Sequence, residues 1–385
     1  MSVNTQVPTS VPAKRSLIPS GTPLIWLMIF GILSAIGLFA AGMILVQGQS
    51  ALATSNFVPW NIFVSAYVFF VVTSTGLCFI SAFGHVIGIE RYEIISKRAV
   101  TLSLIMLAVG MFAIMLDIGR PWMMINMLFS PNLQSPMFWM GLLYGIYGFL
   151  LTMELIAINK GNHKKVKLWG TLGVLSALIA HGTLGALFGM LYARDLWYGE
   201  YMPIYFILSA FVSGLAALTM FIYLSYGSTL KAIPAKLESL LKELGRILAY
   251  ALGALLFFVF WKTVAGLYAG KVETSMLLFG DYAIRFWVFE VIVGILVPMF
   301  ILANKSMRNK SGIVFSALLV LTGLVIARLN LVIVGQLARP FEQGIATYSA
   351  NALEIMFFVG LFGMAGFLYM IASYFLKFEK FEEQV

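Results

Sequence analysis

Charged residues are scarce in this sequence: they make up only 11% of its 385 residues, against roughly 25% in an ordinary soluble domain. No hydrophilic segment is long enough to form a separate soluble domain. Cys78, inside an apolar run, is the only cysteine, which excludes a disulfide framework, a thiolate zinc site, an iron–sulfur cluster and a CxxCH haem attachment. A water-soluble fold is therefore excluded, and protein-bound electron carriers would have to belong to another chain.

Histidine is nearly as scarce, with three residues in the whole chain. A bis-histidine haem needs two histidines at similar depth in the membrane. We expect His85 at the cytoplasmic end of a helix, His163 in a cytoplasmic loop and His181 in the middle of the membrane. HExxH, GxSxG and Walker sequences are also missing. We therefore expect no haem, no bound metal and no hydrolase or nucleotide site of a familiar kind.

Apolar residues dominate instead, at 61% of the chain. Runs of about twenty of them predict an all-α integral membrane protein with about ten transmembrane helices. The first run lacks a clear small-residue cleavage site, so we expect it to be retained as a helix. The predicted spans lie near residues 24–46, 60–85, 98–117, 136–158, 167–193, 202–226, 246–268, 281–303, 312–337 and 352–376.

The basic residues indicate an orientation. Eighteen of the 25 Lys and Arg residues fall on the side of both termini, and three lie within spans. This bias predicts that both termini are cytoplasmic, and it explains the net charge of +9 without any nucleic-acid partner. The loops on the opposite side carry only Arg120, Arg194, Lys271 and Arg339.

The longest hydrophilic interruption suggests how the chain is divided. We predict a cytoplasmic linker at 227–245, between a six-helix bundle at 24–226 and a four-helix bundle at 246–377. Residues 1–23, rich in Ser, Thr and Pro, are expected to form a disordered cytoplasmic tail, and 378–385 a second tail. No internal repeat is visible.

Ionisable groups within a membrane are candidates for function. Asp117 and Arg120 lie three residues apart where Gly119 and Pro121 end the third span, close enough to pair on one helix face. A simple ion pair at a helix end, beside tryptophans at the membrane interface, is about equally consistent with this pattern.

The fifth span carries His181, Gly185, Phe188 and Tyr192 at helical spacing, followed by Arg194. Small residues beside an aromatic ring leave room for a flat ligand. The alternative is that the glycines allow close helix packing.

The second span carries Tyr67, Ser74, Cys78, Ser81 and His85 within one narrow sector of the helix. Such a stripe suggests a path for protons or water, although hydrogen bonds between helices are the more common explanation of such a pattern. The expected proton path comprises Ser74, Ser81, His85, Glu154 and Glu290.

Several charged and polar groups of the last four spans map to their outer halves, with Glu290 deeper. Asp281 and Arg285 have the spacing of a local ion pair. We favour a role in locking the helices together over catalysis. The other members of this group are Lys262, Arg328, Asn330 and Glu354.

Taken together, these motifs resemble the NrfD/PsrC family, the haem-free quinone-interacting membrane subunits of polysulfide reductase-type enzymes. The likeness rests on the DIGRP sequence at 117–121, on Ser135-Pro136 with Trp139, and on the segments 181–197 and 203–214. Glu290 with Pro298, Arg328-Leu-Asn330, and Tyr348 with Glu354 resemble a longer, ten-helix branch that includes the membrane subunit of periplasmic quinone-linked hydrogenases.

The resemblance implies a site for menaquinone or ubiquinone. In shorter members a histidine and an asparagine contact the quinone, and they align here with Tyr67 and Val64. Conversion of quinone to quinol takes two electrons and two protons and needs hydrogen-bond donors at its oxygens. We expect Asp117, Arg120 and His181 to act in catalysis. Quinone contacts are expected from Tyr67, Arg120, Trp139, His181, Tyr192 and Arg194.

The resemblance further implies a multi-pass protein of the bacterial inner membrane. Its electrons would pass to or from a periplasmic iron–sulfur subunit, with a molybdopterin or nickel–iron catalytic subunit beyond. Two alternatives stay open: a secondary transporter or channel that uses the intramembrane charges, and a purely structural anchor for a redox complex.

Overall fold

The computed structural model describes residues 22–338, 344–376 and 378. Within them, ten helical spans are long and apolar enough to cross a membrane, so the all-α membrane fold is confirmed. Arg339 and nearly all of the two predicted tails lie outside the described residues.

Most spans begin and end within four residues of the predicted positions, but α3 begins eight residues earlier and α8 eleven residues earlier. They are α1 (Thr22–Gln47), α2 (Ile62–His85), α3 (Glu90–Asp117), α5 (Pro136–Asn159), α6 (His163–Gly189), α7 (Met202–Ser225), α8 (Ala235–Tyr268), η4 (Arg285–Leu296) continued by α10 (Val297–Ala303), α11 (Lys310–Leu329) continued by η5 (Asn330–Val334) and α12 (Gly335–Leu337), and α13 (Ala352–Leu376). The short elements are η1 (Gly48–Ala51), η2 (Pro121–Ile125), α4 (Asn126–Phe129), η3 (Leu230–Ala232) and α9 (Val272–Phe279).

Local signals set several of these helix ends. The side chains of Asn61, Asn162 and Asn309 accept hydrogen bonds from backbone N–H groups in the first turns of α2, α6 and α11. Proline occupies the first turn of α5 and α7, where its missing N–H costs nothing. Helical structure is also what a bilayer demands, because each backbone polar group must find its partner within the protein.

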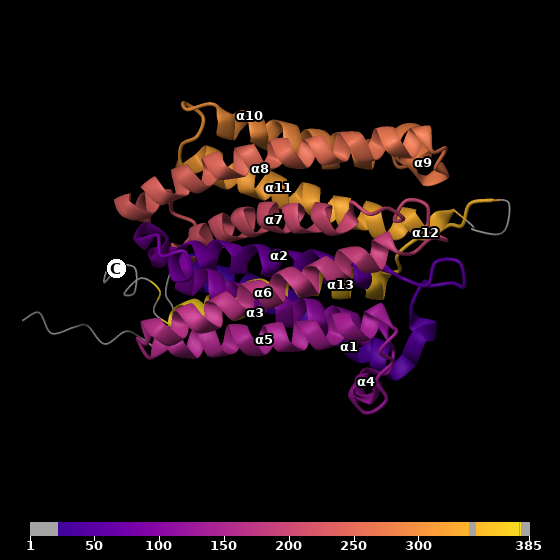
Figure 1. Ribbon diagram of the computed structural model, residues 1–385, viewed down its shortest axis with the longest axis horizontal. Coiled ribbons are helices and arrows are strands. Elements are labelled where there is room, and N and C mark those ends of the chain that lie inside the picture. The colour runs from indigo at the N-terminus through magenta and orange to yellow at the C-terminus, as the bar shows by residue number, and fades with distance from the viewer. Residues whose placement is uncertain (1–21, 339–343, 377, 379–385) are drawn as a thin grey trace, which may run out of the picture.

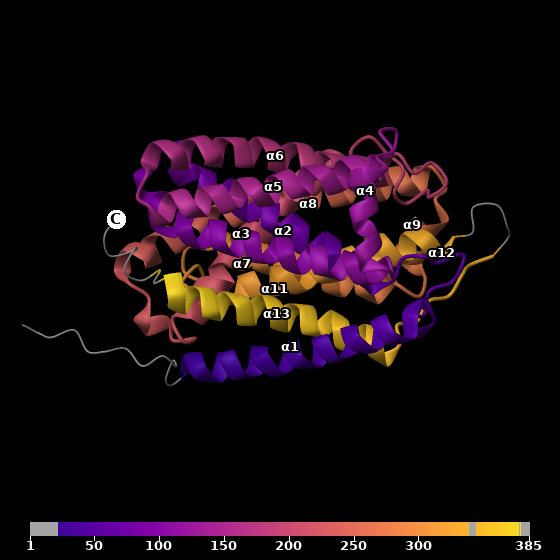
Figure 2. The ribbon, with the colours of Figure 1, turned by 90° about the horizontal axis from the view of Figure 1, so that it is seen from below.

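The long helices run side by side along one common direction (Figures 1 and 2). The N-terminal end of α1 and the C-terminal end of α13 lie at one end of the molecule, which we call the inner end. The short helices α4, α9 and α12 lie at the opposite, outer end (Figure 1). The inner end carries the predicted cytoplasmic loops, and which side it faces in the membrane stays a prediction.

Helix α2 is the centre of the structure, and nearly all of its residues are buried. It packs against α3, α6 and α7, whereas α1 lies mainly along α13 (Figure 2). A Cβ atom added at Gly76 of α2 would come 3.0 Å from the backbone nitrogen of Gly214 in α7. The two backbones therefore touch, as small residues permit in membrane helices.

The predicted linker at 227–245 is only partly a loop, because the residues from Ala235 onward form the first three turns of α8. Leu237, Leu241 and Leu244 are buried along one face of these turns, a helical periodicity that hydropathy over a long window misses. Contacts also cross the expected boundary, since α7 packs against α8 and α11. The division into six and four helices therefore stays a prediction.

Two segments, η4 and η5, are wound as π-helices. Such wide turns are rare and occur frequently at functional sites. Gly294 of η4 meets Gly323 of α11, where an added Cβ would lie 2.7 Å from the facing Cα.

The contact between α2 and α7 can be tested by adding a side chain where the two backbones touch. Gly76→Leu should destabilise the protein by about 1–3 kcal/mol or more, because the side chain would have to displace the backbone of α7. Thermal unfolding in detergent, followed by fluorescence-detected gel filtration, measures the effect. Gly145→Leu is the matched control, since a Cβ at Gly145 meets nothing within 4 Å. Equal stability of the two variants would contradict the packing.

The orientation can be tested by thiol labelling, because the native Cys78 is fully buried. Exposed Lys164, near the inner end, and exposed Glu200, near the outer end, are each replaced by cysteine. In intact cells an impermeant maleimide should label Glu200→Cys and spare Lys164→Cys until the membrane is opened. The reverse pattern would overturn the predicted orientation.

Candidate functional site

A cavity of about 260 Å³ lies towards the outer end, between α2, α3, α5 and α6. Its walls are mostly apolar and rich in methionine, a flexible and polarisable side chain that adapts to flat apolar ligands. The methionines are Met111, Met124, Met127, Met137 and Met140, and the other lining residues are Trp60, Val64, Tyr67, Val68, Ile114, Asp117, Ile118, Gly141, Tyr144, Leu184, Leu187 and Phe188.

Besides the indole of Trp60, three lining side chains carry hydrogen-bonding groups: Tyr67, Asp117 and Tyr144. Tyr67 comes from α2, is 3% exposed, and its hydroxyl donates only a weak bond, 3.4 Å long, to the sulfur of Met140. Its ring stands edge-on to that of Tyr144, with centroids 6.4 Å apart. The cavity thus combines an apolar body with a few polar contacts, as ligand pockets generally do.

Tyr144 connects the cavity to His181, which is completely buried in α6. The Nε2 atom of His181 lies 3.3 Å from the carbonyl oxygen of Phe206, so it must carry the proton in this contact. In the neutral ring Nδ1 is then the acceptor, and the hydroxyl of Tyr144 donates to it over 3.3 Å. His181 therefore acts on the cavity through Tyr144.

The predicted ion pair between Asp117 and Arg120 is absent from the structure. Asp117 is the last residue of α3 and lines the cavity. The chain then turns at Gly119, which has a φ of +74°, and Arg120 lies exposed ahead of η2. Because the helix stops at Asp117, the three-residue spacing no longer brings the two side chains onto one face.

Three other expected quinone contacts also lie outside the cavity. Trp139 is 43% exposed and donates to the carbonyl oxygen of Leu133. Tyr192 follows the end of α6, is 78% exposed and packs against Tyr198. For Tyr192, helical spacing predicted otherwise because α6 was expected to run four residues further.

Arg194, the third, holds the outer loops together. Its guanidinium donates to the carbonyl oxygens of Gln336, Ala338 and Phe57, and burial lowers its pKa. Nearby, Trp197 stacks on Trp60, with ring centroids 5.1 Å apart. Trp60 in turn lines the cavity, so this outer layer forms its roof.

Gly185 and Gly189 of α6 serve helix packing and leave no space for a ligand. A Cβ at Gly185 would lie 2.6 Å from the Cα of Pro203, and one at Gly189 would lie 2.7 Å from the carbonyl oxygen of Gly199. Of the predicted stripe, only Phe188 reaches the cavity.

A second polar group lies one helical turn inward from Tyr144. The hydroxyl of Tyr147 lies 2.8 Å from that of Ser103 and 3.2 Å from that of Ser74, and these two hydroxyls are 3.0 Å apart. All three residues are buried. Three helices, α2, α3 and α5, thus contribute to one hydrogen-bonded cluster.

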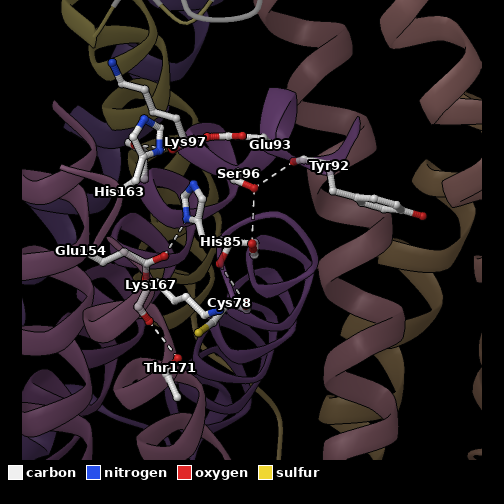
Figure 3. A network of polar contacts seen from close by, with 12 residues as sticks. Cys78, His85, Tyr92, Glu93, Ser96, Lys97, Glu154, His163, Lys167 and Thr171 are labelled. Atoms are coloured by element: carbon white, nitrogen blue, oxygen red, sulfur yellow. Dashed lines mark hydrogen bonds and ion pairs between the residues drawn. The ribbon is translucent and has the colours of Figure 1, made fainter. Parts of the chain in front are cut away.

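At the inner end, Nδ1 of His85 lies 2.9 Å from a carboxylate oxygen of Glu154 (Figure 3). Glu154 is 1% exposed, and its other carboxylate oxygen has no partner among the described residues. Ser81 is not part of this contact, because its hydroxyl donates to the carbonyl oxygen of Cys78 in its own helix. Ser74 and His85 therefore contact residues of α5, whereas the hydroxyl of Ser81 bonds within its own helix.

Buried charges also gather between α8, η4 and α11, around a cavity of only about 20 Å³ that Lys262 and Glu290 line. The side-chain amide of Asn330 donates to Glu290 over 2.7 Å. Arg328 donates to the hydroxyl of Ser209, which itself donates to the carbonyl oxygen of Phe206. That carbonyl also faces His181, so hydrogen bonds link this cluster to the main cavity.

The remaining charged candidates are Asp281, Arg285 and Glu354, and none of them lines the cavity. Asp281 precedes the helix and makes no ion pair with Arg285, whose guanidinium lies over the ring of Tyr282. Glu354 accepts bonds from the backbone N–H of Ala53 and from the hydroxyl of Tyr348, each 3.0 Å long. It thereby ties the loop after η1 to the start of α13, in agreement with a locking role.

Sequence reasoning missed Tyr144 and Tyr147. Both belong, with Leu151 and Glu154, to a buried face of α5 at spacings of three and four residues. That periodicity was visible in the sequence, but tyrosine is common in ordinary helix interiors and the stripe points to no chemistry until its neighbours are known.

Comparison with known proteins gives this geometry a context. The chain is 26% identical to a subunit of the selenate reductase of Mesobacillus selenatarsenatis, over 90% of this chain and 92% of the relative. It is 24% identical to the integral membrane subunit of an Hdr-like menaquinol oxidoreductase of Archaeoglobus fulgidus, over 89% and 90%. It is 22% identical to the integral membrane subunit of menaquinone reductase of Nitratidesulfovibrio vulgaris, over 80% and 81%.

A family-level match covers the whole region that contains the cavity. The model of the polysulphide reductase NrfD family matches residues 50–340, which include every helix from α2 to α12. The chain therefore belongs to the polysulphide reductase NrfD family, as the motifs around Asp117 indicated.

Proposed function

We propose that this chain is the quinone-reactive membrane subunit of a respiratory oxidoreductase complex. The observation that carries the proposal is the methionine-lined cavity with Tyr67, Asp117 and Tyr144 on its walls. Two of the relatives are named for menaquinol or menaquinone chemistry, and a quinone would be this chain's substrate as well. The alternative of a secondary transporter finds no comparable support in the cavity or among the relatives.

The cavity fits a quinone head group in its chemistry. Its apolar walls match a flat ring, and the hydroxyl of Tyr67, held only by a weak bond to sulfur, is available to donate to a ring oxygen. A bound quinone supplies the two-electron, two-proton chemistry that the protein side chains lack. Asp117 is the carboxyl group placed to hold or release a proton at the cavity wall.

Tyr144 and His181 position the proton-carrying groups. Because Tyr144 donates to His181, its oxygen presents a lone pair towards the cavity and orders the hydrogen bonds there. His181 is a positioning residue in this arrangement. Arg120 is exposed and does not line the cavity, so we assign it no part in this arrangement.

The electrons would be exchanged with an iron–sulfur subunit docked at the outer end, which we place in the periplasm. The cavity opens among the elements near that end, and the chain's only cysteine is buried in α2, away from it. A molybdopterin or nickel–iron subunit beyond that partner would complete the complex. The chain itself would reside in a bacterial inner membrane, with both termini cytoplasmic.

Protons would travel between the cavity and the inner end along α5. Tyr144, Tyr147 and Glu154 follow one another on its buried face, and each contacts a polar group of another helix. Tyr147 and Glu154 are seven residues apart, about 10 Å along the helix. Water near the unpartnered carboxylate oxygen of Glu154 would bridge this stretch.

The role of Asp117 can be tested in the assembled complex. Asp117→Asn keeps the shape of the cavity wall and removes the titratable proton, so quinone turnover should fall about 10²-fold or more. Steady-state assays with a soluble quinol analogue give kcat and KM. Asp281→Asn is the matched control, because Asp281 is exposed at the same end and does not line the cavity. Full activity of Asp117→Asn would favour a purely structural anchor.

The proton path is tested by Glu154→Gln, which keeps the size of the side chain and removes its charge. We expect turnover in detergent to fall roughly 10-fold and the membrane potential built per electron in proteoliposomes to fall with it. Glu93→Gln is the control, because Glu93 lies at the same end and its carboxylate is 3.7 Å from the imidazole of His163. An unchanged potential per electron in Glu154→Gln would exclude this route.

A further inference from the structure

A groove lies at the inner end, away from the cavity between α2, α3, α5 and α6. It measures about 820 Å³ and is formed by the first turns of α3 and the first three turns of α8. Its lining residues are Glu90, Arg91, Ile94, Lys236, Ser239, Leu240, Lys242, Glu243, Arg246 and Ile247. The proposed quinone function uses none of them.

The groove carries four cationic side chains and two acidic ones. Glu243 is already engaged, because Arg91 donates to its carboxylate over 2.6 Å and the hydroxyl of Tyr92 over 2.7 Å. Lys236 and Arg246 are exposed, and neither forms an ion pair with an acidic side chain within the part of the chain that the structure describes. The groove therefore has positive charge left to bind an anion.

The floor of the same groove is apolar. Ile94 and Leu240 are 8% and 3% exposed, and Ile247 is half-buried beside them. Contact with these apolar side chains would not stabilise a bound inorganic anion. A ligand that joins an anionic group to hydrocarbon would contact both surfaces at once.

The position of the groove along α8 also favours a ligand of this kind. Helix α8 has 34 residues, which corresponds to about 50 Å, whereas the hydrocarbon core of a bilayer is about 30 Å thick. Its uninterrupted apolar stretch begins directly after Arg246. The turns from Lys236 to Arg246 therefore stand at the level of lipid headgroups, with Ile94 and Ile247 at the border of the hydrocarbon.

We infer that this groove binds an anionic phospholipid, with the phosphate held by Arg246 and Lys236 and an acyl chain lying on Ile94 and Ile247. Basic pockets between helices on the cytoplasmic side suit such headgroups. The lipid would join α3 to α8, two helices that otherwise share few contacts. Each cation removed should weaken binding about 5-fold, since a basic residue near the lipid surface contributes about that factor.

Native mass spectrometry of the purified full-length chain tests the inference, with added phosphatidylglycerol as the probe and phosphatidylcholine as the neutral comparison. The wild type should bind phosphatidylglycerol in preference. The double variant Lys236→Gln/Arg246→Gln should bind it roughly 25-fold more weakly, while Lys236→Arg/Arg246→Lys should bind like the wild type. Unfolding temperatures measured in parallel show that the variants are folded.

The control variant is Lys164→Gln/Lys165→Gln, which removes two exposed cations from the inner end outside the groove. An equal loss of phosphatidylglycerol in this control would overturn the inference in favour of a diffuse effect of surface charge. Displacement of the lipid by millimolar inorganic phosphate would overturn it in favour of a soluble-anion site. Unchanged binding by the Lys236→Gln/Arg246→Gln variant would overturn it outright.

Discussion

Direct contact between the backbones of α2 and α7 is the interaction on which the rest of the structure depends. Gly76 and Gly214 have no side chains to separate the helices, so α2 becomes surrounded by protein along nearly its whole length. A helix in that position can carry polar groups that lipid would exclude. Tyr67, Ser74 and His85 all point from it into the protein interior, where partners from other helices meet them.

The polar interior is organised around α5 and α6, and it leads away from the cavity in two directions. One set of contacts follows α5, where Tyr144 meets His181, Tyr147 meets Ser103 and Glu154 meets His85. The other passes from His181 to the carbonyl oxygen of Phe206 and reaches Arg328 through Ser209. Buried charges are costly unless they are paired or hydrogen-bonded. The hydrogen bonds in both sets offset part of this cost, because they are stronger in a low-dielectric interior than in water.

The two ends of the molecule have different roles in our proposal. The outer end has the cavity and a roof held by Arg194 and the stacked Trp60 and Trp197. The inner end has most of the basic side chains and the groove between α3 and α8. Quinone chemistry and an electron-transfer partner belong to the first in our proposal, and the anchoring lipid to the second. The proton path is the only proposed element that joins them.

Prediction from the sequence succeeded where a single strong force acts. All ten spans were found because about twenty apolar residues in a row have no stable place other than a membrane or a protein core. Asp117 and Tyr67 stood out in the sequence because polar groups inside such runs are rare, and both line the cavity. Trp139, Tyr192 and Arg194 do not line the cavity. For Tyr192 and Arg194 the reason is that α6 ends before them and the outer loops fold back.

What the sequence determined by itself is therefore the membrane fold, its helices and the presence of polar groups within them, because hydropathy is a sum over neighbouring residues. Only the tertiary structure decided which of those groups meet. Tyr144 faces His181 across two helices, and Ser74 meets Tyr147, over separations of 37 and 73 residues. Such pairs depend on the rotation of each helix about its axis, which close packing at contacts such as Gly76 with Gly214 sets and local sequence does not.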